Sequence, residues 1–287
     1  MTAQTNIETS IAIVVNPRSG KGKAEQTGQW LVERLLERKI AHSLFTWEWP
    51  PVFDLFTEVW IVGGDGTMNY FINAYKNIDL PLVAFKGGTG NDFVWKLYGD
   101  ISLEDQLELV LNTGAKCVDA VSCNGQLYVN SLGVGFDGEV LGSINTARWL
   151  GGHLGYLSVV IRKIFSYNEP VFTITFGEKI FKEKFLLVII NNSSRTGGGF
   201  MVTPQASITD GLADIVLCKP LSILKRFRWL PVIEKGKHLE KPFIIFTQQQ
   251  EVRIECDKEL SAALDGELIK GKLFEVKVLP GLLSFKY

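Results

Sequence analysis

Two glycine-rich runs, each containing an aspartate, hold the residues of this chain best suited to chemistry. Residues 63–67 (GGDGT) follow an apolar stretch at 58–62, and residues 87–92 (GGTGND) follow another at 80–85. Glycine lets backbone N–H groups approach a ligand because it has no Cβ. A helix that begins after such a turn adds unpaired N–H donors and partial positive charge. Two such turns on one sheet suit a polyphosphate, and their aspartates suit a magnesium ion.

A third loop of this kind, residues 16–23 (NPRSGKGK), follows the apolar run 11–15 and precedes a helical pattern. Its position suits a phosphate. It does not match the P-loop pattern G-x-x-x-x-G-K-[ST], because Ala24 follows Gly22-Lys23 and Pro17 stands where the first glycine belongs. A solvated basic loop remains the alternative.

Two acidic positions stand out in the second half of the chain. Asp265, in the run Leu264-Asp-Gly-Glu267, lies at a predicted hairpin turn, since Asp-Gly is a strong signal for one. Held at the tip of that turn, its carboxylate could act as a general base facing a nucleotide cleft. Asp210 lies in the polar loop 203–214, where its carboxylate and backbone carbonyls could bind a hard cation. A plain turn and an ordinary capped loop are the respective alternatives.

Two further patterns have simpler interpretations. Residues 133–138 (GVGFDG) match G-x-G-x-x-G, but no alternating β/α pattern follows and no acidic residue lies near position 158. We therefore expect tight backbone packing there instead of a dinucleotide site. Residues 224–230 (LKRFRWL) interleave basic and aromatic side chains on a predicted helix. This segment could touch an anionic bilayer, or simply present a solvated basic face.

Alternating strand and helix patterns from 11 to about 115 predict a doubly wound α/β unit. The expected strands are 11–15, 40–45, 59–62 and 82–85, and the expected helices are 24–39, 68–75 and 103–112. Beyond residue 116, turn residues separate short strands and predict an antiparallel β-sandwich or a partly closed barrel. The expected strands there are 118–121, 126–131, 171–176, 185–190, 212–217, 243–246, 251–256 and 273–278, with helices near 150–165 and 222–229.

Bulk composition excludes several classes of protein. The 287 residues carry a formal net charge of −1, which argues against a nucleic-acid binder. Four scattered cysteines without a C-x-x-C pair, and three histidines, argue against a structural zinc site or a disulfide framework. The polar N-terminus does not resemble a signal peptide, and no apolar run approaches the ~20 residues of a spanning helix. These features predict a cytoplasmic protein without a transmembrane segment.

Six elements, in this order, resemble the diacylglycerol kinase catalytic-domain family, which includes bacterial lipid kinases, sphingosine kinases and ceramide kinases. They are residues 16–20, 63–69, 88–93, Asp119, residues 210–214 and residues 264–267. The resemblance implies a nucleotide-binding α/β domain like that of NAD kinases, over 1–118. It further implies a β-rich lipid-substrate domain over 119–287, whose last residues could pack back on the first domain. The active site would lie in the cleft between the two domains.

The resemblance also implies an activity and its residues: ATP-dependent phosphorylation of a lipid hydroxyl, as in diacylglycerol. Asp265 would be the general base with Glu267 beside it, and Asp65 with Asp92 would organise the magnesium nucleotide. ATP would be held by Asn16, Thr46, Gly63, Gly64, Asp65, Gly66, Thr67, Thr89, Asn91 and Asp92. A structural Mg²⁺ would be bound by Ser207, Asp210 and Leu212, with Asp119 in the same acidic network.

The expected partner is a lipid at the inner membrane surface, with no nucleic acid, while a homodimer stays open. The chain departs from the family at two places: Tyr70 stands where a glutamate is frequent, and Val94-Trp95 where an Ala-Arg pair is usual. Two rivals remain at this point, a soluble NAD kinase and a nucleotide-binding protein without catalysis.

Overall fold

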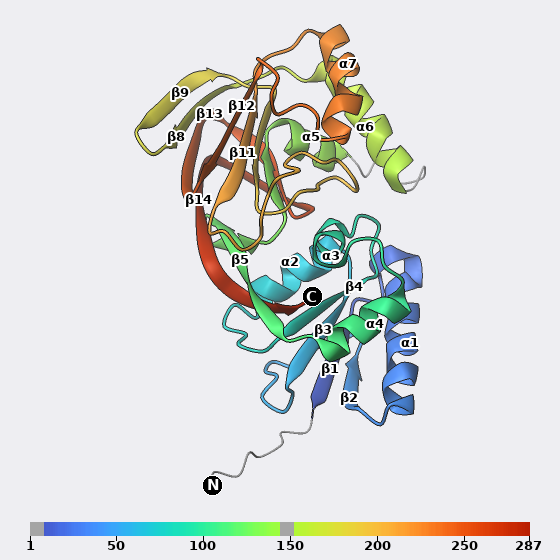
Figure 1. Cartoon of the computed structure of the whole chain (residues 1–287). Coiled ribbons are helices and arrows are strands. Elements are labelled where there is room, and N and C mark those ends of the chain that lie inside the picture. The colour runs from blue at the N-terminus through green and yellow to red at the C-terminus, as the bar shows by residue number, and fades with distance from the viewer. Residues whose placement is uncertain (1–8, 144–151) are drawn as a thin grey trace. The chain divides into compact units, whose positions relative to one another are not determined.

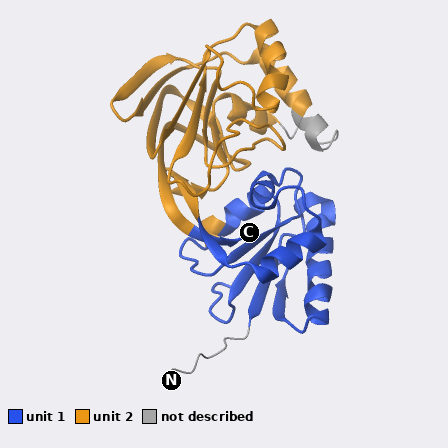
Figure 2. Ribbon diagram, in the orientation of Figure 1, with its two compact units in different colours: residues 1–71, 75–117, 283–287 blue, residues 72–74, 118–282 orange. Residues whose placement is uncertain are grey.

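The computed structural model describes residues 9–143 and 152–287 (Figure 1). The chain divides into two compact units (Figure 2). The first comprises residues 1–71, 75–117 and 283–287, and the second comprises 72–74 and 118–282. The N-terminal segment that we expected not to be a signal peptide lies mostly outside the described residues, which begin at residue 9.

The first unit is built on a parallel sheet in the order β2-β1-β3-β4. The C-terminal end of β14 (Glu267–Lys286) adds Phe285 beside Leu82 of β4. The elements in chain order are β1 (Ser10–Val15), α1 (Lys23–Glu37), β2 (Ala41–Phe45), β3 (Glu58–Gly63), α2 (Asp65–Ala74), β4 (Leu82–Lys86), α3 (Asp92–Tyr98) and α4 (Leu103–Asn112). This arrangement confirms the predicted α/β architecture.

Hydrophobic patterning explains these elements. Every residue from Ile11 to Val15 is fully buried, as expected for a strand covered on both faces in a parallel sheet. Helix α1 buries Leu31 and Leu35, which lie four residues apart on one face. Helix α4 begins at the predicted residue because the Ser102 hydroxyl accepts a hydrogen bond from the backbone N–H of Asp105 at 3.0 Å.

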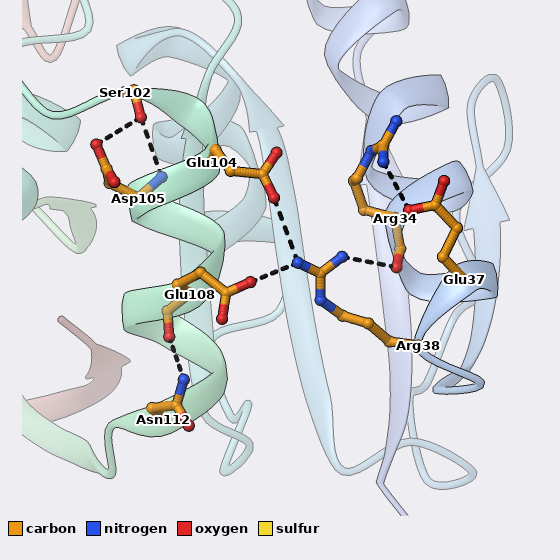
Figure 3. A network of polar contacts seen from close by, with 8 residues as sticks. All are labelled: Arg34, Glu37, Arg38, Ser102, Glu104, Asp105, Glu108 and Asn112. Atoms are coloured by element: carbon orange, nitrogen blue, oxygen red, sulfur yellow. Dashed lines mark hydrogen bonds and ion pairs between the residues drawn. The ribbon is translucent and has the colours of Figure 1, made fainter.

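Helices α1 and α4 lie side by side and are joined by Arg38, the residue that follows α1 (Figure 3). Its guanidinium donates to Glu108 and, at 3.3 Å, to Glu104. The same side chain donates to the carbonyl of Arg34 at 3.1 Å. These contacts are largely exposed, so they align the two helices while contributing little to stability.

The second unit is a β-sandwich-like domain with three helices among its described residues. Its main strand order is β12-β11-β10-β7-β13-β14, with β8 and β9 extending from β13, and β5 and β6 from β14. The elements are β5 (Ala115–Cys123), β6 (Gln126–Tyr128), β7 (Ser131–Val134), α5 (Phe136–Ser143), α6 (Gly152–Ser166), β8 (Val171–Phe176), β9 (Lys179–Lys184), β10 (Leu187–Asn191), β11 (Ala213–Cys218), α7 (Ile223–Glu234), β12 (Ile244–Gln249) and β13 (Glu251–Leu264).

Both faces of the central strands of this unit are buried, each in a different core. In β11, Ile215 and Leu217 enter a core formed between strands, which contains Phe172 and Phe274. The alternate residue Val216 enters a second core beneath α5, α6 and α7, with Val160. Period-two alternation therefore assigns one face to the sandwich interior and the other to the helices.

The last residues of β14 are anchored within the first unit. The Tyr98 hydroxyl donates to the carbonyl of Lys286 at 2.8 Å, and the Lys286 ammonium pairs with Glu58 at 2.8 Å. The ring of Phe285 packs edge-on against Phe93 at 5.4 Å between centroids. These contacts insert the end of the chain into the α/β unit.

Several features differ from the expectations drawn from sequence. The strand predicted at 126–131 is two strands, β6 and β7, and β13 and β14 are much longer than the predicted 251–256 and 273–278. Helix α2 begins at Asp65, so the glycine run itself forms its first turn. Helix α5 begins inside the segment 133–138, and strand β9 is a charged edge strand that was not predicted. The helix predicted near 150–165 is α6, and its first two predicted positions lie outside the described residues.

Candidate active site

Three loops of the first unit meet at the carboxyl end of its sheet. They are 16–22 after β1, 64–67 at the β3–α2 junction, and 87–92 after β4. The backbone N–H of Asn16 donates to the carbonyl of Val62 at 3.1 Å, and that of Gly87 donates to Gly63 at 2.8 Å. In open α/β sheets, ligands bind outside the carboxyl ends of the strands. All three loops that the sequence singled out therefore lie where such a fold places its ligand.

The glycines of these loops are required by close packing of one loop on another. A Cβ on Gly88 would lie 2.4 Å from the Cα of Gly64, and one on Gly20 would lie 2.2 Å from the carbonyl oxygen of Gly87. Gly20 also has a φ of 59°, which side chains rarely adopt. The sequence suggested glycines cleared for a ligand, whereas the structure shows that these glycines make room for neighbouring backbone.

Asp65 joins the second loop to the third. One of its carboxylate oxygens accepts the backbone N–H of Asp92 at 3.2 Å, and the other accepts that of Phe93 at 3.1 Å. The carboxylate therefore caps the first turn of α3, where helix N–H groups lack partners. Burial raises the pKa of Asp65 above its ordinary value, and these backbone hydrogen bonds oppose the shift.

Asn16 and Thr67 join the first loop to the second. The Asn16 amide donates to the Thr67 hydroxyl at 3.0 Å, and the Asn16 carbonyl oxygen accepts the backbone N–H of Arg18 at 3.1 Å. The Thr67 side chain lies over Gly63, where a Cβ would be 2.4 Å away. Gly66 lies in the first turn of α2, between Asp65 and Thr67.

The remaining predicted nucleotide-binding residues lie around these loops. Asn91 has a φ of 53° and binds Gly88 in both directions, accepting at 2.8 Å and donating at 2.9 Å. Asp92 is buried, Thr89 is exposed, and Thr46 is half-buried directly after β2. The structure thus brings together the three loops, while Thr46 belongs to a fourth segment of the same unit.

The two departures from the family pattern have local partners. The exposed ring of Tyr70 contacts Trp49 at 5.7 Å between centroids. The Trp95 indole donates to Asp100 at 3.2 Å, and Val94 is buried. Tyr70 therefore has a ring contact and Trp95 a hydrogen bond within the first unit.

Asp265 occupies a hairpin turn and is nevertheless buried. With φ values of 46° and 85°, Asp265 and Gly266 form the two-residue turn between β13 and β14, as the sequence predicted. A turn tip is normally exposed, yet Asp265 is only 3% exposed. Its carboxylate accepts backbone N–H groups from Ser131 at 2.7 Å, Val129 at 2.8 Å and Asn130 at 3.1 Å.

These hydrogen bonds connect the turn at Asp265 to the backbone of residues 129–131. Three charge-assisted hydrogen bonds compensate the burial of an ionised carboxylate. Glu267, two residues later, begins β14 and is exposed. Sequence reasoning missed the amides of 129–131, since backbone donors leave no signature in residue types.

The predicted metal loop is held together by its own hydrogen bonds. Asp210 is exposed and accepts the backbone N–H of Leu212 at 3.1 Å, while the Ser207 hydroxyl contacts that of Thr209 at 3.3 Å. Both carboxylate oxygens of Asp119 are engaged, by the N–H groups of Gly211 at 2.7 Å and Gly281 at 2.8 Å.

Asp119 therefore fastens the loop to the bend of β14, and its observed partners are amides. Within residues 9–143 and 152–287, no three acidic, histidine or cysteine side chains gather as a metal site. A cation at this loop would have Asp210 and backbone carbonyls as ligands, and the donor set shown does not by itself define a magnesium site.

Residues 133–138 serve packing, as predicted. A Cβ on Gly133 would lie 2.3 Å from the carboxylate of Asp137, and one on Gly138 would lie 2.2 Å from the backbone of Ser261. Burial raises the pKa of Asp137 to about 6. The segment therefore lets α5 pack closely on β7 and β13.

A cavity of about 520 Å³ in the second unit is lined by none of the predicted catalytic, nucleotide-binding or metal-binding residues. Its wall carries both signs of charge, from Lys163, Lys184 and Lys258 and from Glu139, Glu169 and Asp257. Lys163 and Glu139 are already paired at 2.8 Å. The balance of charge gives no preference for an anion or a cation.

Comparison with known proteins assigns the family that this fold and these loops define. Residues 10–123 match the diacylglycerol kinase catalytic domain, and residues 130–286 match the YegS C-terminal NAD kinase beta sandwich-like domain. The two matches cover most of the chain in sequence order. The chain therefore belongs to the diacylglycerol kinase and YegS-like lipid kinase family, with an N-terminal α/β domain and a C-terminal β-sandwich domain.

Individual relatives agree with this assignment. The chain is 27% identical over 211 residues to a diacylglycerol kinase of Bacillus subtilis, covering 71% of this chain and 69% of that protein. It is 24% identical over 291 residues to a diacylglycerol kinase of Mycobacterium tuberculosis, covering 96% and 94%.

Solved structures show the same fold. A crystal structure of a putative diacylglycerol kinase from Bacillus anthracis superposes with a TM-score of 0.81 at 23% identity, covering 100% of this chain and 97% of that one. An NAD kinase from Archaeoglobus fulgidus in complex with ATP has a TM-score of 0.56 at 13% identity, covering 97% of this chain and 94% of that one.

Proposed function

We propose that this protein is an ATP-dependent lipid kinase that transfers the γ-phosphoryl group to a hydroxyl of a lipid such as diacylglycerol. Membership of the lipid kinase family supports the reaction class. The observation that carries the proposal is the meeting of three glycine loops at the carboxyl end of the parallel sheet, joined by Asp65 and Asn16. That edge is where phosphate-bearing ligands bind in such folds.

The first unit would hold the nucleotide. Residues Asn16, Thr67 and Asn91 fix the three loops by side-chain hydrogen bonds, so the backbone around the phosphates would be preorganised. Thr46, Thr89 and the 63–67 turn would complete the nucleotide site. Magnesium, when bound with ATP, would offset negative charge on the phosphates, with Asp92 and Asp65 as the acidic residues nearest these loops.

The second unit would supply the group that receives the proton. Phosphoryl transfer needs positioning and charge stabilisation more than a strong base. Asp265 suits this role because three amides hold its carboxylate in one place. We propose that Asp265 accepts the proton of the lipid hydroxyl, with Glu267 beside it. We place the protein in the cytoplasm, in peripheral contact with the membrane.

A direct assay tests this function. Purified protein, radiolabelled ATP and Mg²⁺ would be incubated with diacylglycerol, monoacylglycerol, phosphatidylglycerol or a sphingoid base, and in a parallel arm with NAD. We expect label in a lipid product resolved by thin-layer chromatography. Labelled NADP in the absence of any lipid product would make the protein an NAD kinase, and ATP binding without any turnover would make it a nucleotide-binding protein.

A further inference from the structure

Helices α6 and α7 expose a compact apolar patch that no part of the proposed reaction uses. On α6, Ile161 and Phe165 lie four residues apart on one face, and Phe165 is 61% exposed. At the start of α7, Leu224 is 83% exposed and Ile223 is 40% exposed. Large apolar side chains are rarely left so exposed in a cluster without a partner. We call these four residues the α6–α7 patch.

The patch is one surface because the two helices are fastened together. The rings of Phe165 and Phe227 pack at 5.0 Å between centroids. Beneath them, the largely buried guanidinium of Arg226 donates from α7 to the carbonyls of Ile164 at 2.8 Å and Tyr167 at 3.2 Å. The same guanidinium pairs with Glu169.

The opposite sides of both helices are committed to the core of the second unit. Val160 and Ile164 of α6 are buried there, and Phe227 and Leu230 of α7 pack against the same core. The helices therefore cannot rotate to hide the patch without losing that core. Its exposure is fixed by the fold.

Three exposed cations lie on α6 and α7 next to the residues of the patch. Arg162, Lys225 and Arg228 are exposed next to it, and among the described residues none of the three has an ion-pair partner. Over residues 157–166 and 223–234 the sole acidic side chain is Glu234, at the end of α7. Because the whole chain has a net charge of −1, this excess is local.

We propose that the α6–α7 patch docks the protein on an anionic lipid bilayer. Apolar side chains surrounded by lysine and arginine are the chemistry of peripheral membrane contact: the apolar groups enter the interface, and the cations remain at the head groups. Four apolar side chains make a small, reversible contact. The inference rests on the proposed lipid kinase activity, since that substrate brings the protein to a bilayer.

Vesicle sedimentation tests the docking directly. Full-length protein would be mixed with vesicles of phosphatidylcholine containing 30% phosphatidylglycerol, or of phosphatidylcholine alone. We expect binding to the anionic vesicles and a loss of about tenfold or more in Leu224→Glu and Phe165→Glu. Removing one cation, in Lys225→Gln or Arg228→Gln, should cost about fivefold. Leu55→Glu is the matched control, because Leu55 is 87% exposed in the first unit, and it should bind like the unaltered protein.

Two substrates separate docking from catalysis. Patch variants should lose activity on long-chain diacylglycerol in anionic vesicles and keep it on a short-chain, water-soluble diacylglycerol. Equal vesicle binding by Leu224→Glu, Phe165→Glu and the control would overturn the proposal. So would a patch-dependent dimer in sedimentation equilibrium without vesicle binding, which would show that a second copy covers the patch. Patch-dependent vesicle binding with no activity on any lipid would retain the docking site and refute the lipid kinase function.

Discussion

The carboxylate of Asp65, in the first turn of α2, accepts the backbone N–H of Phe93, in the first turn of α3, at 3.1 Å. One side chain thus ties together the beginnings of two helices that follow neighbouring strands. An aspartate in a glycine turn suggested a magnesium ligand, and the structure adds a second role, which is to fix the spacing between two candidate phosphate loops. The two roles are separable by experiment.

Asp65→Asn should loosen the start of α3. Each carboxylate oxygen of Asp65 accepts one backbone N–H, so the substitution sets an amide NH₂ against one of these donors. We expect a loss of about 1–3 kcal/mol in the free energy of unfolding, as for a buried donor left unpaired. Hydrogen exchange at the amides of Asp92 and Phe93 should accelerate, and ATP affinity should fall.

Asp79→Asn is the control for this variant, because the exposed Asp79 lies between α2 and β4 in the same unit. It should change stability by no more than about 0.5 kcal/mol. If Asp65→Asn lost ATP affinity with unaltered exchange at Asp92 and Phe93, Asp65 would act on the nucleotide alone and would not position the loop.

Gly88→Ala should push apart the loops 64–67 and 87–92. Its Cβ would lie 2.4 Å from the Cα of Gly64, and backbone on both sides would have to move. Overpacking of this kind costs about 1–3 kcal/mol. We expect ATP affinity to fall by about tenfold or more, measured by calorimetric titration, because the phosphates would meet a displaced backbone.

A matched alanine substitution is available in the same unit. A Cβ on Gly114 would meet no atom within 4 Å, and Gly114 does not have a positive φ. Gly114→Ala should leave ATP affinity unchanged. Equal ATP affinity in Gly88→Ala and Gly114→Ala would show that the packing of the two loops does not control nucleotide binding.

Asp265→Asn should reduce turnover by roughly 10²–10⁴-fold, the usual contribution of a general base. It should also lower stability, since an amide NH₂ would face one of the backbone donors of residues 129–131. ATP affinity should be unchanged, because the nucleotide loops belong to the other unit. Turnover would be followed by product formation at saturating ATP, and stability by urea unfolding.

Asp257→Asn, on the same strand at an exposed position, controls for loss of one charge and should retain turnover and stability. Nearly full turnover in Asp265→Asn, accompanied by the loss of stability, would leave Asp265 as an anchor for the turn and no more.

Local patterns with strong signals were predicted to the residue. Helix α4 matched because Ser102 caps it, and β8 matched because its apolar residues alternate and turn residues bound it. Helix α5 was missed because its first residues lie in a glycine-rich segment, where helix propensity is low. Strand β9 was missed because exposed charges dominate an edge strand.

The sequence points to side chains of the candidate site and not to the backbone groups that hold them. The sequence pattern singled out Asp265, and the family resemblance added Asp119. The groups that bind them are amides of residues 129–131, Gly211 and Gly281. Any residue type except proline supplies such a donor, so no spacing rule could identify them. The same limit applies to Gly88, whose neighbour Gly64 is close only in the folded chain.

Asp137→Asn should stabilise the protein, and more so at high pH. Burial raises the pKa of Asp137 to about 6 in the folded state, above the value of about 4 in the unfolded chain. The unfolded state then binds fewer protons than the folded state between these values, so the carboxyl group destabilises the fold as pH rises through this window. The neutral amide of asparagine removes that cost.

The advantage of Asp137→Asn in the free energy of unfolding should grow by roughly 1 kcal/mol between pH 5 and pH 8. Urea unfolding at both pH values measures it, with exposed Asp54→Asn as a control that should show no such growth. An advantage that stayed constant or shrank over this range would mean that the Asp137 carboxylate has a stabilising partner in the fold. In that case the buried Asp137 side chain beside Gly133 would be held as a charged carboxylate and not as a neutral carboxyl group.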